Sequence, residues 1–135
     1  MKRILLLLCL AGCLLSTQCR TYKGFNTWFC TNKAQDTICY LYIDGINKGS
    51  LPYLPESPDC GNNSLREKAL FMHLESGKYK LEVKDQQSKL FYSGTIVIKR
   101  SGHSISLSSS TSQKNAAEVK FINNNDCLIN YICFE

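Results

Sequence analysis

The sequence predicts an all-β protein, an antiparallel β-sandwich of about eight strands that follows a cleaved N-terminal signal segment. Short runs of aromatic and β-branched residues recur along the chain, and clusters of Gly, Pro, Asn, Asp and Ser separate them. No internal repeat or heptad pattern is visible. The chain has 135 residues, of which 44% are hydrophobic and 20% are charged, which gives room for one folded domain.

The first two strands are expected at residues 25–30 and 37–44. Both segments are rich in aromatic and β-branched residues, and the polar loop 31–36 between them is typical of a hairpin. In the second segment both alternating sets of side chains are largely apolar, which indicates a central strand. Asp44 and Gly45 then begin a turn.

The middle of the chain combines an irregular segment with two further strands. Residues 49–63 contain all three prolines and follow no regular pattern. A helical turn is expected at residues 64–69, with Ser64 as its N-cap and Glu67 at the spacing of a capping box. The two strands that follow are expected at residues 70–74 and 78–84.

The C-terminal third predicts more strands, joined by turns and one longer loop. Gly94 is a candidate β-bulge, and the serine-rich residues 108–115 are expected to form a loop. The last two strands form a hairpin around residues 123–125. The strands of this part are expected at residues 89–99, 103–108, 116–122 and 126–134.

The N-terminus has the pattern of an export signal. Lys2 and Arg3 form a short positive stretch, and an apolar run begins at Ile4. The apolar segment through Leu15 would measure only about 18 Å as a helix, against a hydrocarbon core of about 30 Å. The segment is therefore too short to span a membrane comfortably, and it predicts a cleaved signal.

Leu10-Ala11-Gly12-Cys13 resembles the lipobox of bacterial lipoproteins. The resemblance implies cleavage before Cys13 and attachment of diacylglycerol to its sulfur. It divides the chain into a signal peptide (1–12), a lipid-anchor and tether segment (13–24) and a single β-sandwich domain (25–135). Three alternatives are cleavage before Cys19, ordinary signal-peptidase cleavage that releases a soluble protein, and a buried N-terminal helix.

Six cysteines remain after this cleavage and the lipidation of Cys13, an even set that allows three disulfide bonds. Cys127 and Cys133 would lie roughly 20 Å apart on a straight strand, whereas bridged Cα atoms lie about 4.4 to 6.8 Å apart, so these two do not pair with each other. Cys30 and Cys39 are candidate partners across the first loop. Disulfides are favoured over a metal site, because no closely spaced cysteine pair occurs. The disulfide candidates are Cys19, Cys30, Cys39, Cys60, Cys127 and Cys133.

Three segments carry a second resemblance: Tyr42-Ile43-Asp44-Gly45, Gly49-Ser50-Leu51-Pro52 and residues 74–83. Together they resemble the PEGA-type surface domain and related prealbumin-like sandwiches of bacterial envelope proteins. The chain departs from that pattern by an insertion at residues 53–72 and by lacking a clear glycine-tyrosine motif after the central strand. The resemblance implies a β-sandwich, an envelope location and no enzymatic activity.

The residues that could carry chemistry form no recognisable catalytic or metal motif. His73 and His103 lie on separate expected strands, and no nucleophile-elbow, zinc-protease, phosphate-loop or dinucleotide motif occurs. We therefore predict no catalytic residue, no metal and no cofactor. The formal charge of +5, or +3 without Lys2 and Arg3, is spread along several strands and does not indicate nucleic-acid binding.

Aromatic residues gather in the first third of the chain, where most are expected to fill the core. Tyr53, beside the proline-rich segment, is the candidate ligand-binding residue, as part of an exposed platform for a glycan or peptide. The expected function is a non-enzymatic, lipid-anchored protein of the bacterial envelope, at the outer membrane or periplasmic face. It would act as a binding or structural module for an envelope protein or glycan. The alternative is a soluble secreted inhibitor or effector that binds a target protein.

Overall fold

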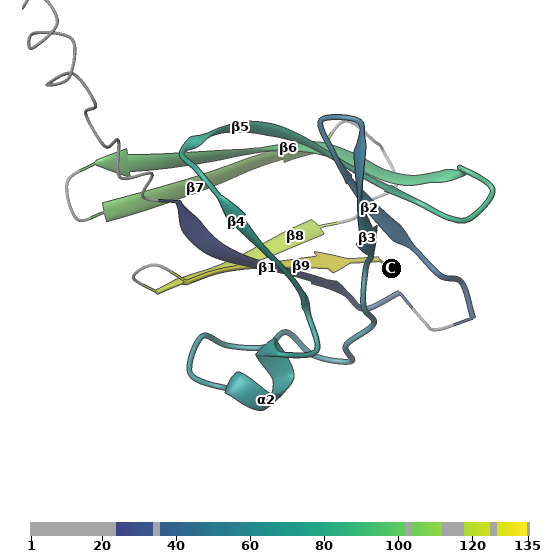
Figure 1. Cartoon of the computed structure of the whole chain (residues 1–135), viewed down its shortest axis with the longest axis horizontal. Coiled ribbons are helices and arrows are strands. Elements are labelled where there is room, and N and C mark those ends of the chain that lie inside the picture. The colour runs from purple at the N-terminus through teal and green to yellow at the C-terminus, as the bar shows by residue number, and fades with distance from the viewer. Residues whose placement is uncertain (1–23, 34–35, 102–103, 112–117, 125–126, 135) are drawn as a thin grey trace, which may run out of the picture.

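The computed structural model describes residues 24–33, 36–101, 104–111, 118–124 and 127–134. Two β-sheets face each other, which confirms the predicted all-β sandwich (Figure 1). Sheet A has the order β4-β1-β9-β8, and sheet B has the order β3-β2-β5-β6-β7. The strands are β1 (Phe25–Thr31), β2 (Tyr40–Ile43), β3 (Ile46–Ser50), β4 (Leu70–Leu74), β5 (Gly77–Lys84), β6 (Leu90–Ser101), β7 (Ser104–Thr111), β8 (Glu118–Asn124) and β9 (Cys127–Cys133).

Six strand pairings are antiparallel, and the pairing of β1 with β9 is parallel. This exception brings the first and last described strands together in the middle of sheet A. The expected hairpin between the first two strands is wrong, because β1 belongs to sheet A and β2 to sheet B. The segment between them crosses from one sheet to the other, over a gap of about 10 Å, so that both strands bury apolar residues in the same core.

The main core lies between the two sheets. Every second side chain along a strand points into this core. The sequence shows this alternation most clearly in β5. Tyr92 is the largest of the fully buried side chains. The buried members are Phe25, Phe29, Cys39, Leu41, Ile43, Leu51, Leu74, Leu81, Val83, Tyr92, Ile96, Ile98, Leu128 and Ile132.

The turn between β2 and β3 follows the sequence prediction. Asp44 and Gly45 both have positive φ, of 51° and 79°, as a two-residue type I′ hairpin turn requires. The Asp44 carboxylate also accepts a hydrogen bond of 2.8 Å from the backbone N–H of Lys80, which ties the turn to β5. β2 lies between β3 and β5, so its predicted central position is confirmed.

A second apolar cluster lies on the face of sheet A that points away from sheet B. The segment between β3 and β4, which includes the short helix α2 (Asn63–Arg66), covers this face (Figure 1). Backbone hydrogen bonds fix its start, because Thr31 donates to Pro52 (3.0 Å) and Leu54 donates to Thr31 (2.8 Å). The buried members of the cluster are Cys30, Leu54, Ala69 and Tyr131.

Three local predictions need correction. The N-cap of α2 is Asn62, whose side chain accepts from the N–H of Leu65, so neither Ser64 nor Glu67 has the expected capping role. Gly94 pairs regularly with Leu81. A register shift lies instead between Val83 and Lys84, at the end of β5 beside the turn to β6.

The serine-rich segment that begins at residue 108 is strand up to Thr111, where it pairs with β6, rather than loop. The backbone hydrogen bonds of the ladder outweigh a composition that is typical of loops. Among the described residues, no helix is both long and apolar enough to cross a membrane.

Candidate functional site

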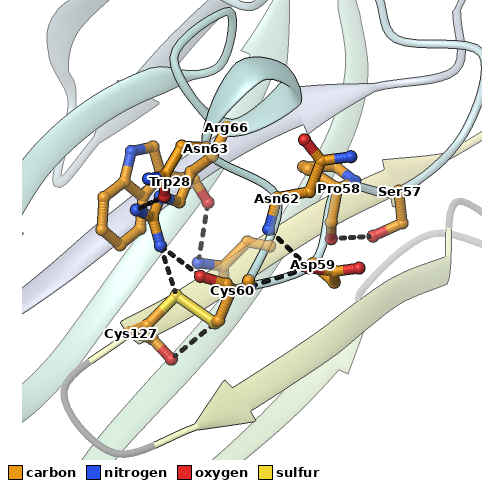
Figure 2. The surroundings of a disulfide bond; sticks show 11 residues. Trp28, Ser57, Pro58, Asp59, Cys60, Asn62, Asn63, Arg66 and Cys127 are labelled. Carbon is orange, nitrogen blue, oxygen red and sulfur yellow. Dashed lines mark hydrogen bonds between the residues drawn. A yellow bond between two sulfur atoms is a disulfide. The ribbon is translucent and has the colours of Figure 1, made fainter.

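The structure joins Cys60 to Cys127 in a disulfide bond, with Cα atoms 6.1 Å apart (Figure 2). Cys60 lies in the segment that covers sheet A, and Cys127 is the first residue of β9. The bond closes a sequence separation of 67 residues. It therefore attaches the covering segment directly to the sheet beneath it, and the expected presence of a disulfide is confirmed.

Arg66 lies beside this disulfide. Its Nη1 donates to the carbonyl oxygen of Cys60 at 2.5 Å and lies 4.0 Å from Sγ of Cys127, while its Nη2 donates to the side chain of Asn63 (Figure 2). The guanidinium also lies over the Trp28 ring, 4.7 Å from its centroid. Arg66 thus joins α2, the disulfide and strand β1 in one contact network.

Cys30 and Cys39 are thiols that lie apart from each other. Cys30 is buried in the outer cluster and Cys39 in the core between the sheets, so the suggested Cys30–Cys39 pair is wrong. Burial raises the pKa of the Cys30 thiol to about 12, with a further contribution from Cys133. Burial likewise raises the pKa of Cys39, although Lys33 opposes the rise. Both thiols therefore stay protonated and are poor nucleophiles at neutral pH.

The remaining cysteine predictions have different outcomes. Sγ of Cys133 lies 3.7 Å from the carbonyl oxygen of Tyr131, at the edge of the outer cluster. Cys13, with the lipobox, and Cys19 lie outside the described residues.

Tyr53, the predicted ligand-binding residue, lines a hollow at one end of the sandwich. The hollow has two adjoining parts of about 260 Å³ and about 460 Å³, and Lys33, Thr37 and Ile38 line both. Tyr53 belongs to the smaller part, and Phe91 belongs to the larger part. Tyr53 is half-buried, and its backbone forms a parallel bridge to Thr31. We call these two parts together the end hollow.

Two lysines surround one aromatic ring in the end hollow. Nζ of Lys33 lies 4.4 Å from the centroid of Phe91 and 5.4 Å from that of Phe134, and Nζ of Lys89 lies 5.5 Å from the centroid of Phe91. In the described part of the chain neither lysine forms an ion pair. Each ammonium group lies near an aromatic ring, which stabilises the cation without neutralising it.

The end hollow also contains two acidic residues, Asp36 and Asp85, so its formal charges balance, although neither carboxylate forms an ion pair with Lys33 or Lys89 among the described residues. Oδ1 of Asp85 accepts hydrogen bonds from the backbone N–H groups of Gln87 and Lys89, both at 2.9 Å, so this carboxylate stabilises the turn between β5 and β6. Asp36 lies on the exposed rim. The arrangement provides cationic donors, an exposed apolar side chain at Ile38 and aromatic surface, which together suit a ligand with a negative group and an apolar part.

The histidines lie away from the end hollow. Nδ1 of His73 lies 3.2 Å from Oδ1 of Asn26 on the exposed outer face of sheet A, and His103 lies outside the described residues. Within the parts of the chain that the structure describes, no three His, Cys, Asp or Glu side chains gather in a possible metal site.

Comparisons with known proteins found no matching family model, no matching curated protein and no matching solved structure. Sequence reasoning identified Tyr53 but missed Lys33, Phe91 and Lys89. These three come from two loops and a strand that only the folded sheets bring together, so no local pattern could have revealed them.

Proposed function

We propose that the protein is a non-enzymatic binding module of the bacterial envelope, tethered by a lipid on Cys13, which uses the end hollow to bind an anionic envelope glycan. The observation that carries the binding role is the pair of lysines around Phe91, neither of which is ion-paired among the described residues. Tyr53 and Ile38 add the flat and apolar surfaces on which a sugar ring can stack.

Two features support the envelope location. Leu10-Ala11-Gly12-Cys13 follows a basic and apolar leader, as lipoprotein signals do. The Cys60–Cys127 disulfide suits an oxidising compartment, because cytosolic thiols are kept reduced. The buried, protonated thiols of Cys30 and Cys39 supply no activated nucleophile, which favours recognition over catalysis.

The tether is tested by metabolic labelling with radioactive palmitate, followed by membrane fractionation. The intact chain is expected to incorporate label and to sediment with membranes, and Cys13→Ala is expected to lose both properties. Cys19→Ala is the matched control and retains both. Loss of label in Cys19→Ala alone would move the anchor to Cys19, and an unlabelled soluble chain would favour the secreted inhibitor or effector.

The end hollow is tested by co-sedimentation of the full chain with isolated peptidoglycan sacculi, which carry free carboxylates. The double variant Lys33→Gln/Lys89→Gln is expected to lose at least about 90% of the binding, because each lost ion contact costs about 1 kcal/mol or more. Lys48→Gln/Lys78→Gln removes the same charge from two exposed lysines elsewhere and is expected to bind normally. Equal loss in both pairs would indicate a general charge effect and contradict the site.

A further inference from the structure

The Cys60–Cys127 disulfide is accessible and lies where it can control the covering segment. Both cysteines are half-buried, so a small thiol can reach their sulfur atoms. Backbone hydrogen bonds attach the start of the covering segment to β1, through Pro52 and Leu54, whereas the disulfide attaches its middle to β9. Breaking the disulfide would therefore free the middle of the segment while its start stays in place.

Arg66 places a positive charge beside one of the two sulfur atoms. Its Nη1 lies 4.0 Å from Sγ of Cys127 (Figure 2). The guanidinium is held in this position by the carbonyl oxygen of Cys60, the side chain of Asn63 and the ring of Trp28, all of which are uncharged. In the described part of the chain Arg66 forms no ion pair, so its contacts leave the charge available to the sulfur.

The acidic residue next to Cys60 has a different role. Oδ1 of Asp59 accepts hydrogen bonds from the backbone N–H groups of Gly61 and Asn62, both at 2.7 Å. This carboxylate therefore stabilises the turn that leads into α2, and it makes no ion pair with Arg66 among the described residues.

A cation beside Cys127 gives thiol–disulfide exchange a preferred direction. In this reaction a thiolate attacks one sulfur of the disulfide, and the other sulfur leaves as a thiolate. A neighbouring guanidinium stabilises a thiolate, so the sulfur beside Arg66 is the better leaving group. The attacking thiol is then expected to bond to Sγ of Cys60.

We propose that the Cys60–Cys127 disulfide is a redox-sensitive switch, in which a thiol reductant attacks Cys60, Cys127 leaves as a thiolate beside Arg66, and the covering segment is released from sheet A. The attacking thiol loses its proton to solvent, and the electron pair of the broken S–S bond goes to Sγ of Cys127. A second thiol then attacks the mixed disulfide and releases Cys60. The protein disulfide is thus reduced to two thiols while two reductant thiols are oxidised to a disulfide.

The role of Arg66 is tested by the rate at which dithiothreitol reduces the disulfide in the folded full chain. Arg66→Gln is expected to slow the reduction at least about threefold, because the leaving thiolate loses its cation. Lys68→Gln removes the same charge from an exposed side chain two residues away and is expected to react like the wild type. If Arg66 only held the covering segment in place, its loss would loosen the segment and speed the reduction. A faster or unchanged rate in Arg66→Gln would therefore overturn the proposal.

The direction of attack is tested on the wild-type chain, so it does not depend on how a variant folds. The protein reacts briefly with reduced glutathione, and free thiols are then trapped with iodoacetamide and mapped by mass spectrometry. Glutathione is expected mainly on Cys60, with the alkyl group on Cys127. The reverse distribution, or equal amounts on both cysteines, would contradict the proposed leaving group.

Release of the covering segment is read from two buried thiols of the same chain. Cys30 lies beneath the segment in the outer cluster, whereas Cys39 lies in the core between the sheets. Reduction of the Cys60–Cys127 disulfide is expected to speed alkylation of Cys30 at least about tenfold while Cys39 stays protected. Equal protection of both thiols in the reduced protein would show that the segment stays closed, and equal exposure would indicate general unfolding. Either result would overturn the switch.

Discussion

The two apolar clusters of this protein are closed in different ways. The main core is closed by regular strands from both sheets, and its side chains alternate along each strand. The outer cluster around Cys30 and Tyr131 is closed by a segment with only one short helix, which the Cys60–Cys127 disulfide holds to β9. Strand pairing alone thus closes the first cluster, whereas a covalent bond joins the backbone hydrogen bonds in closing the second.

The outer faces of the two sheets differ correspondingly. Sheet A is covered at Cys30 and Tyr131, but sheet B presents Lys80, Glu82 and Lys84 along β5. The outer face of sheet A thus lies under the covering segment, whereas on the outer face of sheet B two lysines form ion pairs with Glu82. Four substitutions or sets of substitutions test this difference, from the largest expected effect to the smallest.

Removing the disulfide is expected to have the largest effect. Cys60→Ser/Cys127→Ser should lower the free energy of unfolding by about 4 kcal/mol, because the bond closes a long loop in the unfolded chain. The change is measured by urea denaturation. If the bond also holds the covering segment against sheet A, Cys30 beneath that segment should react faster with a thiol reagent in this variant than in the wild type. An unchanged urea midpoint with Cys30 still protected would contradict the role of the disulfide.

A matched pair of leucine truncations compares the two clusters directly. Leu81→Ala, in the main core, is expected to cost about 3 kcal/mol, because the surrounding strands cannot collapse into the cavity. Leu54→Ala, in the covering segment, is expected to cost only about 2 kcal/mol, because an irregular segment can move inward. Urea denaturation measures both, and a larger cost for Leu54→Ala would reverse the interpretation.

The tyrosine hydroxyls give a second matched pair. Oη of Tyr131 donates to the carbonyl oxygen of Leu54 at 2.8 Å in a buried site, so Tyr131→Phe should cost about 1 to 2 kcal/mol. Oη of Tyr79 donates to the carbonyl oxygen of Glu75 at 2.9 Å in an exposed site, where water can replace it. Tyr79→Phe should therefore change the free energy of unfolding little, as urea denaturation measures for both variants. Equal decreases in the two variants would argue that water reaches the Tyr131 hydroxyl in the outer cluster.

The ion pairs of sheet B are expected to have the smallest effect. The hydrogen bond from Lys80 lowers the pKa of the Glu82 carboxyl, and Lys84 acts in the same direction. A lowered folded-state pKa stabilises the protein above the unfolded pKa, and this contribution disappears as the pH falls through the folded pKa. Glu82→Gln should thus remove less than about 1 kcal/mol at neutral pH and nothing in strong acid. Thermal melts across the acidic range measure it.

The sequence predicted best what depends on neighbouring residues. The alternation of Tyr79, Leu81 and Val83 correctly predicted β5, and Asp44-Gly45 correctly predicted the turn that follows β2. These features depend on side-chain period and on backbone conformation at single residues. Both are encoded locally.

Features that depend on long-range pairing were missed. Nothing near residue 30 indicates that β1 pairs in parallel with a strand that begins at Cys127. The expected first hairpin failed for this reason, and the Cys30–Cys39 suggestion failed with it. The end hollow was found only through Tyr53, because Lys33 and Lys89 are separated by more than fifty residues of chain.

Mass spectrometric mapping of the cysteines tests most directly whether the Cys60–Cys127 disulfide holds the covering segment to sheet A. Purified native protein is alkylated, digested without reduction and analysed for linked peptides. We expect a peptide pair joined through Cys60 and Cys127, with Cys30 alkylated only after the protein is unfolded. Alkyl groups on both Cys60 and Cys127 of the native protein would contradict this expectation.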